Sequence, residues 1–188
     1  MSDLLVARGC AGISLPAPAL IGPARLEAAG PLLERVARAG VPLFVHPGRA
    51  ANPRPHEAPL GEPLWWQAMT GYVSQMHAAW LTLATRGRAP HPDLVVVFAM
   101  LAGCAPLQAE RFEQRAGAPI DVTDPFTFYD VSSYGPRAVE TMARLVGPWQ
   151  LLYGSDRPVV EPTWTGREPL LQAQASEVLA RATRAVAA

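Results

Sequence analysis

Short apolar runs alternate along the chain with longer segments in which apolar residues recur at helical spacing. The runs are too short for helices and end at proline, glycine or polar residues, so we expect each of them to form a strand. They are GISL at 12–15, PLFVH at 42–46, LVVVFAM at 94–100, FTFYDVSS at 126–133 and QLLYGSD at 150–156. The third run is apolar throughout, which is typical of a strand buried on both faces of a parallel sheet.

Helices are expected between these strands. The periodicity predicts helices over 27–39 and 63–86, a third from Pro136 to Gly147, and a last one over about 168–186. Strand and helix therefore alternate, which predicts an α/β fold with a parallel sheet, in a single domain over residues 1–188. The segment 47–63 is a long proline-rich loop, and loops of this length in compact domains are often functional.

Polar or sulfur-containing side chains fall where the expected strands end. Parallel sheets bind ligands beyond the carboxyl ends of their strands, and the residues at these ends are His46, Met100, Ser132, Ser133 and Asp156. An imidazole and a carboxylate on one rim can bind a divalent metal or share a proton. Two alternatives stay open: His46 hydrogen-bonds only its own loop, and Asp156 only caps backbone amides of its Gly-Ser-Asp turn.

Composition and charge narrow the class of partner. The chain has 188 residues, 49% of them hydrophobic, and a formal net charge of zero, with no lysine among its sixteen basic residues. Without a basic stripe we expect neither a nucleic-acid partner nor binding to an anionic membrane. Cys10 and Cys104 lack metal-finger spacing, so a reducing, cytoplasmic location is expected. The sequence shows no apolar run of membrane-spanning length and no signal-peptide pattern.

Four segments together resemble part of a known family. GVPLFVHPG, HPDLVVVFAMLAGCAPLQAERF, FYDVSSYGPRAVETMARLVG and LLYGSDRP occur in this order along the chain. In order and spacing they are similar to the C-terminal part of the amidohydrolase-related metal-dependent (β/α)8 barrels. That family includes the aminocarboxymuconate-semialdehyde and γ-resorcylate decarboxylases alongside hydrolases. The resemblance covers about residues 5–165 and implies that the five expected strands correspond to the fourth to eighth strands of a barrel.

The resemblance implies a divalent metal, zinc or manganese, at the carboxyl rim. His46 matches the histidine that ends the fifth strand and binds the metal, and Asp156, within GSDRP, matches the aspartate that ends the eighth strand. We therefore expect His46 and Asp156 to be both metal ligands and catalytic residues. His56 or Glu57 in the long loop can supply a third ligand; the alternative is that both are exposed loop residues.

Two features depart from the family pattern. The sixth-strand position, which normally carries a proton-handling histidine, is Met100, and a thioether cannot shuttle a proton. The sequence also contains no HxH pair and no counterpart of the first three strands. Five strands cannot close an eight-stranded barrel. Three arrangements remain open: pairing with another chain, an open sheet with covered edges, or a sequence that begins downstream of its true start.

Three functional hypotheses follow. The first is a metal-dependent amidohydrolase-family hydrolase or decarboxylase acting on a small carboxylated or cyclic compound. The second is a catalytically impaired small-molecule-binding or partner subunit of the same descent. The third is a homo-oligomer in which two chains share a site. Trp65, Trp66 and Trp80, at near-helical spacing, are expected in the core or at such an interface, and His91, at the start of a strand, is expected at the opposite end of the sheet from the site.

Overall fold

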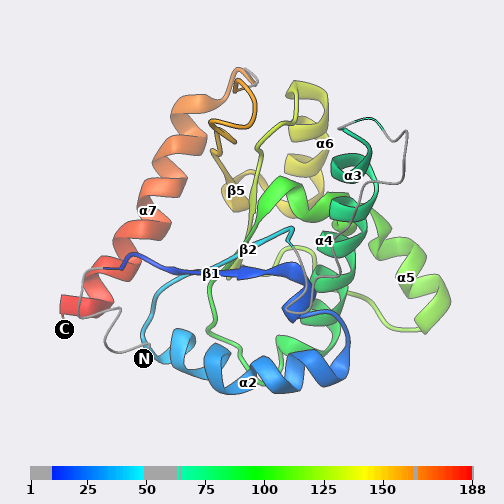
Figure 1. Ribbon diagram of the computed structural model, residues 1–188, viewed down its shortest axis with the longest axis vertical. Helices are drawn as coiled ribbons and strands as arrows, with labels where there is room; N and C mark the ends of the chain where they lie inside the picture. The colour runs from blue at the N-terminus through cyan, green and yellow to red at the C-terminus, as the bar shows by residue number, and fades with distance from the viewer. Residues whose placement is uncertain (1–9, 49–62, 64, 163–164, 188) are drawn as a thin grey trace.

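The central element is a five-stranded parallel sheet in the order β1-β2-β3-β4-β5 (Figure 1). The structure is a computed structural model that describes residues 10–48, 63, 65–162 and 165–187, with side chains described as far as residue 180. The strands are β1 (Ile13–Pro16), β2 (Leu43–His46), β3 (Val96–Phe98), β4 (Thr127–Asp130) and β5 (Leu151–Leu152). The expected α/β class, the parallel direction and the order of the strands are confirmed.

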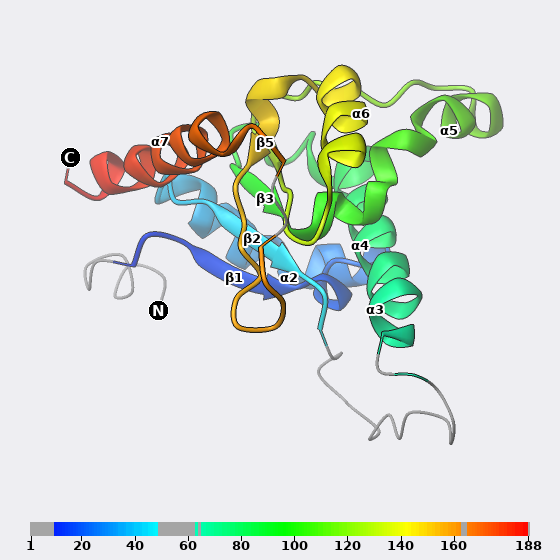
Figure 2. The same cartoon turned by 90° about the horizontal axis from the view of Figure 1, so that it is seen from above.

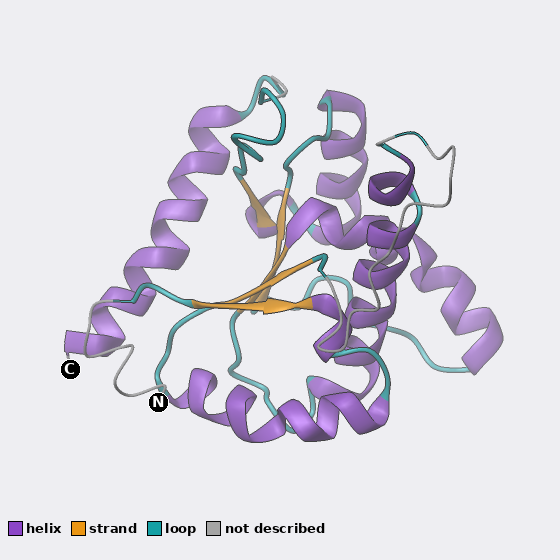
Figure 3. Ribbon diagram, in the orientation of Figure 1, coloured by secondary structure: helices purple, strands orange, loops and turns teal. Residues whose placement is uncertain are grey.

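Helices lie between consecutive strands, and a last helix follows β5 (Figure 3). They are α2 (Pro23–Arg38), α3 (Trp66–Met69), α4 (Gly71–Thr82), α5 (Ala109–Ala116), α6 (Pro136–Val146) and α7 (Glu168–Ala187). The single helix predicted over 63–86 is wrong in detail, because α3 and α4 are separate and a π-helical turn follows over Leu83–Gly87. The break lies at Thr70, which has ψ −72° and whose hydroxyl donates to the carbonyl of Trp66 at 2.7 Å instead of to solvent.

Three predicted strands are shorter than the sequence pattern indicated. β4 ends at Asp130, so Ser132 and Ser133 lie beyond the strand and not at its end. β3 ends at Phe98 because Met100 to Cys104 all have positive φ, between 44° and 61°, which no strand can contain. Within this left-handed stretch Gly103 approaches the backbone so closely that a Cβ atom would lie 2.7 Å from the carbonyl oxygen of Val73. β5 ends at Leu152, and the amide of Tyr153 donates to the carbonyl of Leu171 in α7. The prediction that Asp156 ends a strand is therefore wrong, and this residue lies in the turn beyond β5.

The two faces of the sheet are covered differently. One face packs against α2, α4 and α6 and forms the main core, to which the strands contribute Leu43, Val45, Val96, Phe98, Tyr129 and Leu151. The other face packs against α7, and its cluster contains Val97, Phe128, Leu152 and Val178. Figures 1 and 2 show α7 on the opposite side of the sheet from α4 and α6.

The position of α7 bears on the expected barrel. In a (β/α)8 barrel the helices lie outside, and the second face of each strand lines the interior. Here α7 packs against that second face through Val178 and Ala175. Among the described residues the sheet is open, with β1 and β5 at its edges. The described residues form an open sheet with one face partly covered by a helix, and the three arrangements left open by the sequence stay predictions.

Candidate functional site

The strand register brings two chemistry-bearing side chains to the same level of the sheet. Val45 pairs with Phe98, and Phe98 pairs with Tyr129. His46 and Asp130, each one residue further along its strand, therefore lie at the same level with β3 between them. Two strand spacings correspond to about 10 Å between their backbones. Both belong to the second face, since His46 stacks on Phe44 with ring centroids 6.4 Å apart and Asp130 follows Phe128 by two residues.

His46 is half-buried and presents one ring nitrogen as an electron-pair donor. Its Nδ1 lies 2.7 Å from the carbonyl oxygen of Pro47. Because a carbonyl can only accept, Nδ1 carries the proton and Nε2 carries the lone pair. A backbone carbonyl that fixes the tautomer in this way is the usual partner of a metal-ligating histidine. The chemistry of His46 therefore fits a metal ligand, although it equally satisfies the alternative of a histidine bonded to its own loop.

Asp130 is the residue that sequence reasoning missed. It is the last residue of β4, and only 7% of its surface is exposed. The amide and hydroxyl of Ser132 both donate to its carboxylate, the hydroxyl at 2.7 Å from Oδ2. Burial raises the pKa of Asp130, the bonds from Ser132 oppose this shift, and the charge of Asp156 adds to it. The available signal was the carboxylate itself, in the last position of an otherwise apolar and aromatic strand.

Asp156 lies close enough to Asp130 for their charges to interact, but in a different environment. It is exposed, has a left-handed backbone with φ 54°, and accepts a 2.7 Å hydrogen bond on Oδ2 from the hydroxyl of Ser133. Its carbonyl accepts from the amides of Val159 and Val160, which closes the turn. The turn thus uses the backbone carbonyl of Asp156 and leaves Oδ1 of its carboxylate without a partner among the described residues.

The predicted site residues are brought together only in part. The structure joins Ser133 to Asp156 and Ser132 to Asp130, whereas no hydrogen bond or ion pair of the described residues links His46 to Asp156. Within that part of the chain no three His, Cys, Asp or Glu side chains form a group that could hold a metal ion. His56 and Glu57, the candidates for a third ligand, lie outside the described residues. The assignment of His46 and Asp156 as ligands stays a prediction.

Met100 does not end a strand, because β3 ends at Phe98. It belongs to the left-handed stretch and packs against the main hydrophobic core. The tryptophans differ in exposure: Trp80 is buried in that core, whereas Trp65 and Trp66 are exposed on or beside α3, and their place at an interface stays a prediction. No helix among the described residues is long and apolar enough to cross a bilayer.

An apolar cavity of about 340 Å³ lies between α7 and the second face of the sheet. Phe44, Val97, Leu152 and Val178 contribute apolar walls, and Asp130 lies at its edge. The cavity has the composition typical of a small-molecule site, apolar with few polar groups. The cavity reaches from the buried carboxylate of Asp130 to Gly12 and Pro42 at the amino ends of β1 and β2, and neither His46 nor Asp156 lines it.

The chain was compared with known proteins. Neither a protein family nor a curated protein matches its sequence. Solved structures do match: the apo form of IDCase from Metarhizium anisopliae has a TM-score of 0.68 at 19% identity, covering 99% of this chain and 59% of that one. 4-Oxalomesaconate hydratase LigJ from Rhodopseudomonas palustris has a TM-score of 0.67 at 14% identity, covering 99% and 61%. 5-Carboxyvanillate decarboxylase LigW2 from Novosphingobium aromaticivorans, with bound manganese, has a TM-score of 0.64 at 13% identity, covering 97% and 58%.

These similarities define the fold. The resemblance to the amidohydrolase-related barrels is confirmed at the level of architecture, and the five strands form an incomplete version of that barrel. The chain spans about three fifths of the length of these solved structures.

Proposed function

We propose that the chain carries part of a metal-dependent hydrolase or decarboxylase site of the amidohydrolase type, for a small carboxylated or cyclic compound. The observation that carries this proposal is the 2.7 Å contact between Nδ1 of His46 and the carbonyl oxygen of Pro47, which in the neutral ring leaves the lone pair on Nε2, at the carboxyl end of β2. The solved structures of similar fold support it, since one of them is a decarboxylase with bound manganese. The apolar cavity, which is lined by Asp130 but not by His46 or Asp156, offers room for the ring or hydrocarbon part of such a compound near the Asp130 carboxylate.

In this proposal His46 through Nε2 and Asp156 through Oδ1 hold a divalent ion, zinc or manganese. When bound, such an ion lowers the pKa of a water or polarises substrate oxygens. Ser133 holds the other carboxylate oxygen of Asp156 and so limits how the group rotates. Catalytic zinc sites commonly use three protein ligands. We propose that His56, Glu57 or another copy of the chain supplies a third.

A second candidate function is a small-molecule-binding or partner subunit of the same descent without metal chemistry. The observation that favours it is Met100, which packs against the core where the family pattern has a proton-handling histidine. The cavity between α7 and the sheet would serve such a subunit equally well.

Manganese titration followed by electron paramagnetic resonance separates the two candidates. Wild-type protein is expected to bind close to one Mn²⁺ per chain, or per pair of chains, and His46→Ala to lose at least tenfold in affinity. His91→Ala is the matched control, because His91 precedes β3 at the opposite end of the sheet and should leave binding unchanged. Wild-type protein that binds no metal, or equal losses in both variants, would favour the binding subunit.

A homo-oligomer is proposed as the way in which a shared site is completed. Trp65, Trp66 and Met69 are exposed, with 58%, 42% and 64% of their surfaces accessible, and so provide an apolar contact region at α3. Sedimentation velocity at micromolar concentration tests this, and a monodisperse monomer that binds metal fully would contradict it.

A further inference from the structure

We propose that Asp130 is a positioning residue, which holds the Gly154–Asp156 turn in place and thereby sets the direction of the Asp156 carboxylate. The relevance of that direction to metal binding rests on the proposed function. The positioning itself is a property of the structure and can be tested without a metal.

The first step is that the Asp130 carboxylate is held rigidly. Its backbone is paired with Leu152 in the sheet, its side chain is buried, and Ser132 donates to it through both the amide and the hydroxyl. A side chain fixed by strand pairing and by two donors cannot change rotamer without breaking those bonds.

The second step is direct contact with the turn. Gly154 lies two residues beyond Leu152, and a Cβ atom built on it would overlap both carboxylate oxygens of Asp130 and the hydroxyl oxygen of Ser132. Only glycine allows the chain to approach this closely. The backbone of the turn therefore rests on the Asp130–Ser132 pair.

The third step connects the contact to Asp156. Consecutive serines after β4 each bind one carboxylate, Ser132 that of Asp130 and Ser133 that of Asp156. Ser133 and Asp156 both have positive φ, 66° and 54°, a conformation that costs about 1–2 kcal/mol for a residue with a side chain. Such conformations persist only where surrounding contacts hold them. The described contacts at this place include the two serine–carboxylate bonds, the close approach at Gly154, and the bonds from the amides of Val159 and Val160 to the carbonyl of Asp156.

Hydrogen exchange at the turn tests the proposal. The amides of Val159 and Val160 donate to the carbonyl of Asp156, the last residue of the Gly154–Asp156 segment, and close the turn that begins there. Their exchange rates therefore report whether Asp156 keeps its position. In Asp130→Ala we expect both amides to exchange about three- to tenfold faster than in wild-type protein, as loss of a local hydrogen-bonded support permits more frequent opening. Asp130→Asn keeps the shape and an acceptor for Ser132, so it is expected to restore rates close to those of the wild type.

A matched control is available on the same strand. Asp124 lies near the opposite end of β4, where it pairs with Arg88 at 2.8 Å and accepts from the hydroxyl of Thr127. Asp124→Ala removes an equally bonded carboxylate and should lower stability, yet leave exchange at Val159 and Val160 unchanged. If Asp130→Ala does not fold, Ser132→Ala replaces it, because that change removes the same hydroxyl bond and leaves the carboxylate in place.

Two outcomes overturn the inference. The first is an exchange rate within twofold of wild type in Asp130→Ala, or in Ser132→Ala where that variant replaces it. The second is an equal acceleration of exchange in Asp124→Ala. The Mn²⁺ titration adds a second reading. If wild-type protein binds the ion, Asp130→Ala is expected to weaken binding about tenfold and Asp130→Asn to preserve it. If wild-type protein binds no ion, the proposed function fails, and the exchange rates alone still decide whether Asp130 positions the turn.

Discussion

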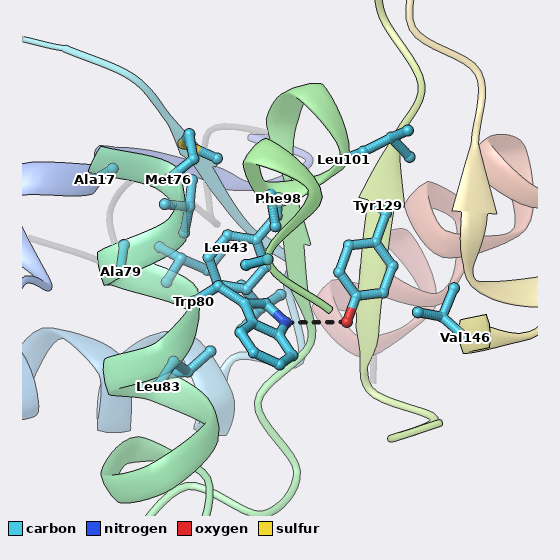
Figure 4. Packing of buried hydrophobic residues seen from close by; sticks show 14 of the residues in the cluster. Ala17, Leu43, Met76, Ala79, Trp80, Leu83, Phe98, Leu101, Tyr129 and Val146 are labelled. Atoms are coloured by element: carbon cyan, nitrogen blue, oxygen red, sulfur yellow. Dashed lines mark hydrogen bonds between the residues drawn. The ribbon is translucent and has the colours of Figure 1, made fainter. Parts of the chain in front are cut away.

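The indole Nε1 of Trp80 donates a 3.0 Å hydrogen bond to the hydroxyl of Tyr129, and both side chains are buried (Figure 4). The bond joins α4 to the strand β4 through the main hydrophobic core. Burial raises the pKa of the Tyr129 hydroxyl above its usual value, so this group stays neutral and remains an acceptor for the indole. Each of these two polar groups is therefore satisfied by the other in an otherwise apolar environment.

Tyr129→Phe is expected to lower the free energy of unfolding by about 1–3 kcal/mol, because it leaves the Trp80 N–H buried without an acceptor. Urea denaturation followed by tryptophan fluorescence measures this loss. Tyr72→Phe is the matched control, since the half-buried Tyr72 hydroxyl has no hydrogen-bond partner among the described residues. Equal effects of the two substitutions would contradict the role given to the Trp80–Tyr129 bond.

Gly103→Ala and Gly117→Ala separate the cost of close packing from the cost of a left-handed backbone. Both glycines have positive φ, 61° and 72°, but only at Gly103 would a Cβ meet another group, the carbonyl oxygen of Val73 at 2.7 Å. We expect Gly117→Ala to cost about 1 kcal/mol and Gly103→Ala about 2–4 kcal/mol, because α4 would have to move. Thermal unfolding of both variants checks the difference, and similar melting temperatures would show that the approach to α4 is not tight.

Asp130→Asn is expected to make stability less dependent on pH. The pKa of Asp130 is raised in the folded protein, so the folded state holds this proton more tightly than the unfolded chain does. Its contribution is therefore largest at low pH and is lost as the pH rises from about 4 through the raised value. Denaturation of wild type and variant between acid and neutral pH should show the variant gaining relative stability as the pH rises. If the difference in unfolding free energy between variant and wild type stays constant over this pH range, the predicted pH dependence is wrong.

Gly154→Ala is expected to destabilise the protein and to interact energetically with Asp130→Ala. The new methyl group overlaps the Asp130 carboxylate, so removing that carboxylate should relieve part of the damage. A double-mutant cycle is expected to give a coupling energy of about 0.5–3 kcal/mol. Gly166→Ala serves as the control, because Gly166 has φ 80° and nothing within 4 Å of a built Cβ. Additive effects of Gly154→Ala and Asp130→Ala would show that the two groups do not press on each other.

The elements were predictable from the sequence because strand and helix formation depends mainly on local apolar periodicity. PLFVH and FTFYDVSS became β2 and β4, and the segment from Pro136 to Gly147 became α6 almost to the residue. His46 was expected at the end of its strand and lies there. The predictions that were wrong concern how far a strand continues. Met100 and Asp156 lie beyond β3 and β5, because contacts with Val73 and with α7 draw the chain out of the sheet.

The sequence by itself determined the order of strands and helices, the parallel class of the sheet, and the presence of a histidine at the end of β2. These follow from the spacing of residues along one chain, which is a local property. Only the tertiary structure decided that Asp130 supports the turn at Gly154, and that α7 covers the sheet face that lines the interior of a closed barrel. Both depend on the register of neighbouring strands and on the side to which a helix crosses, and no residue spacing within one segment encodes either.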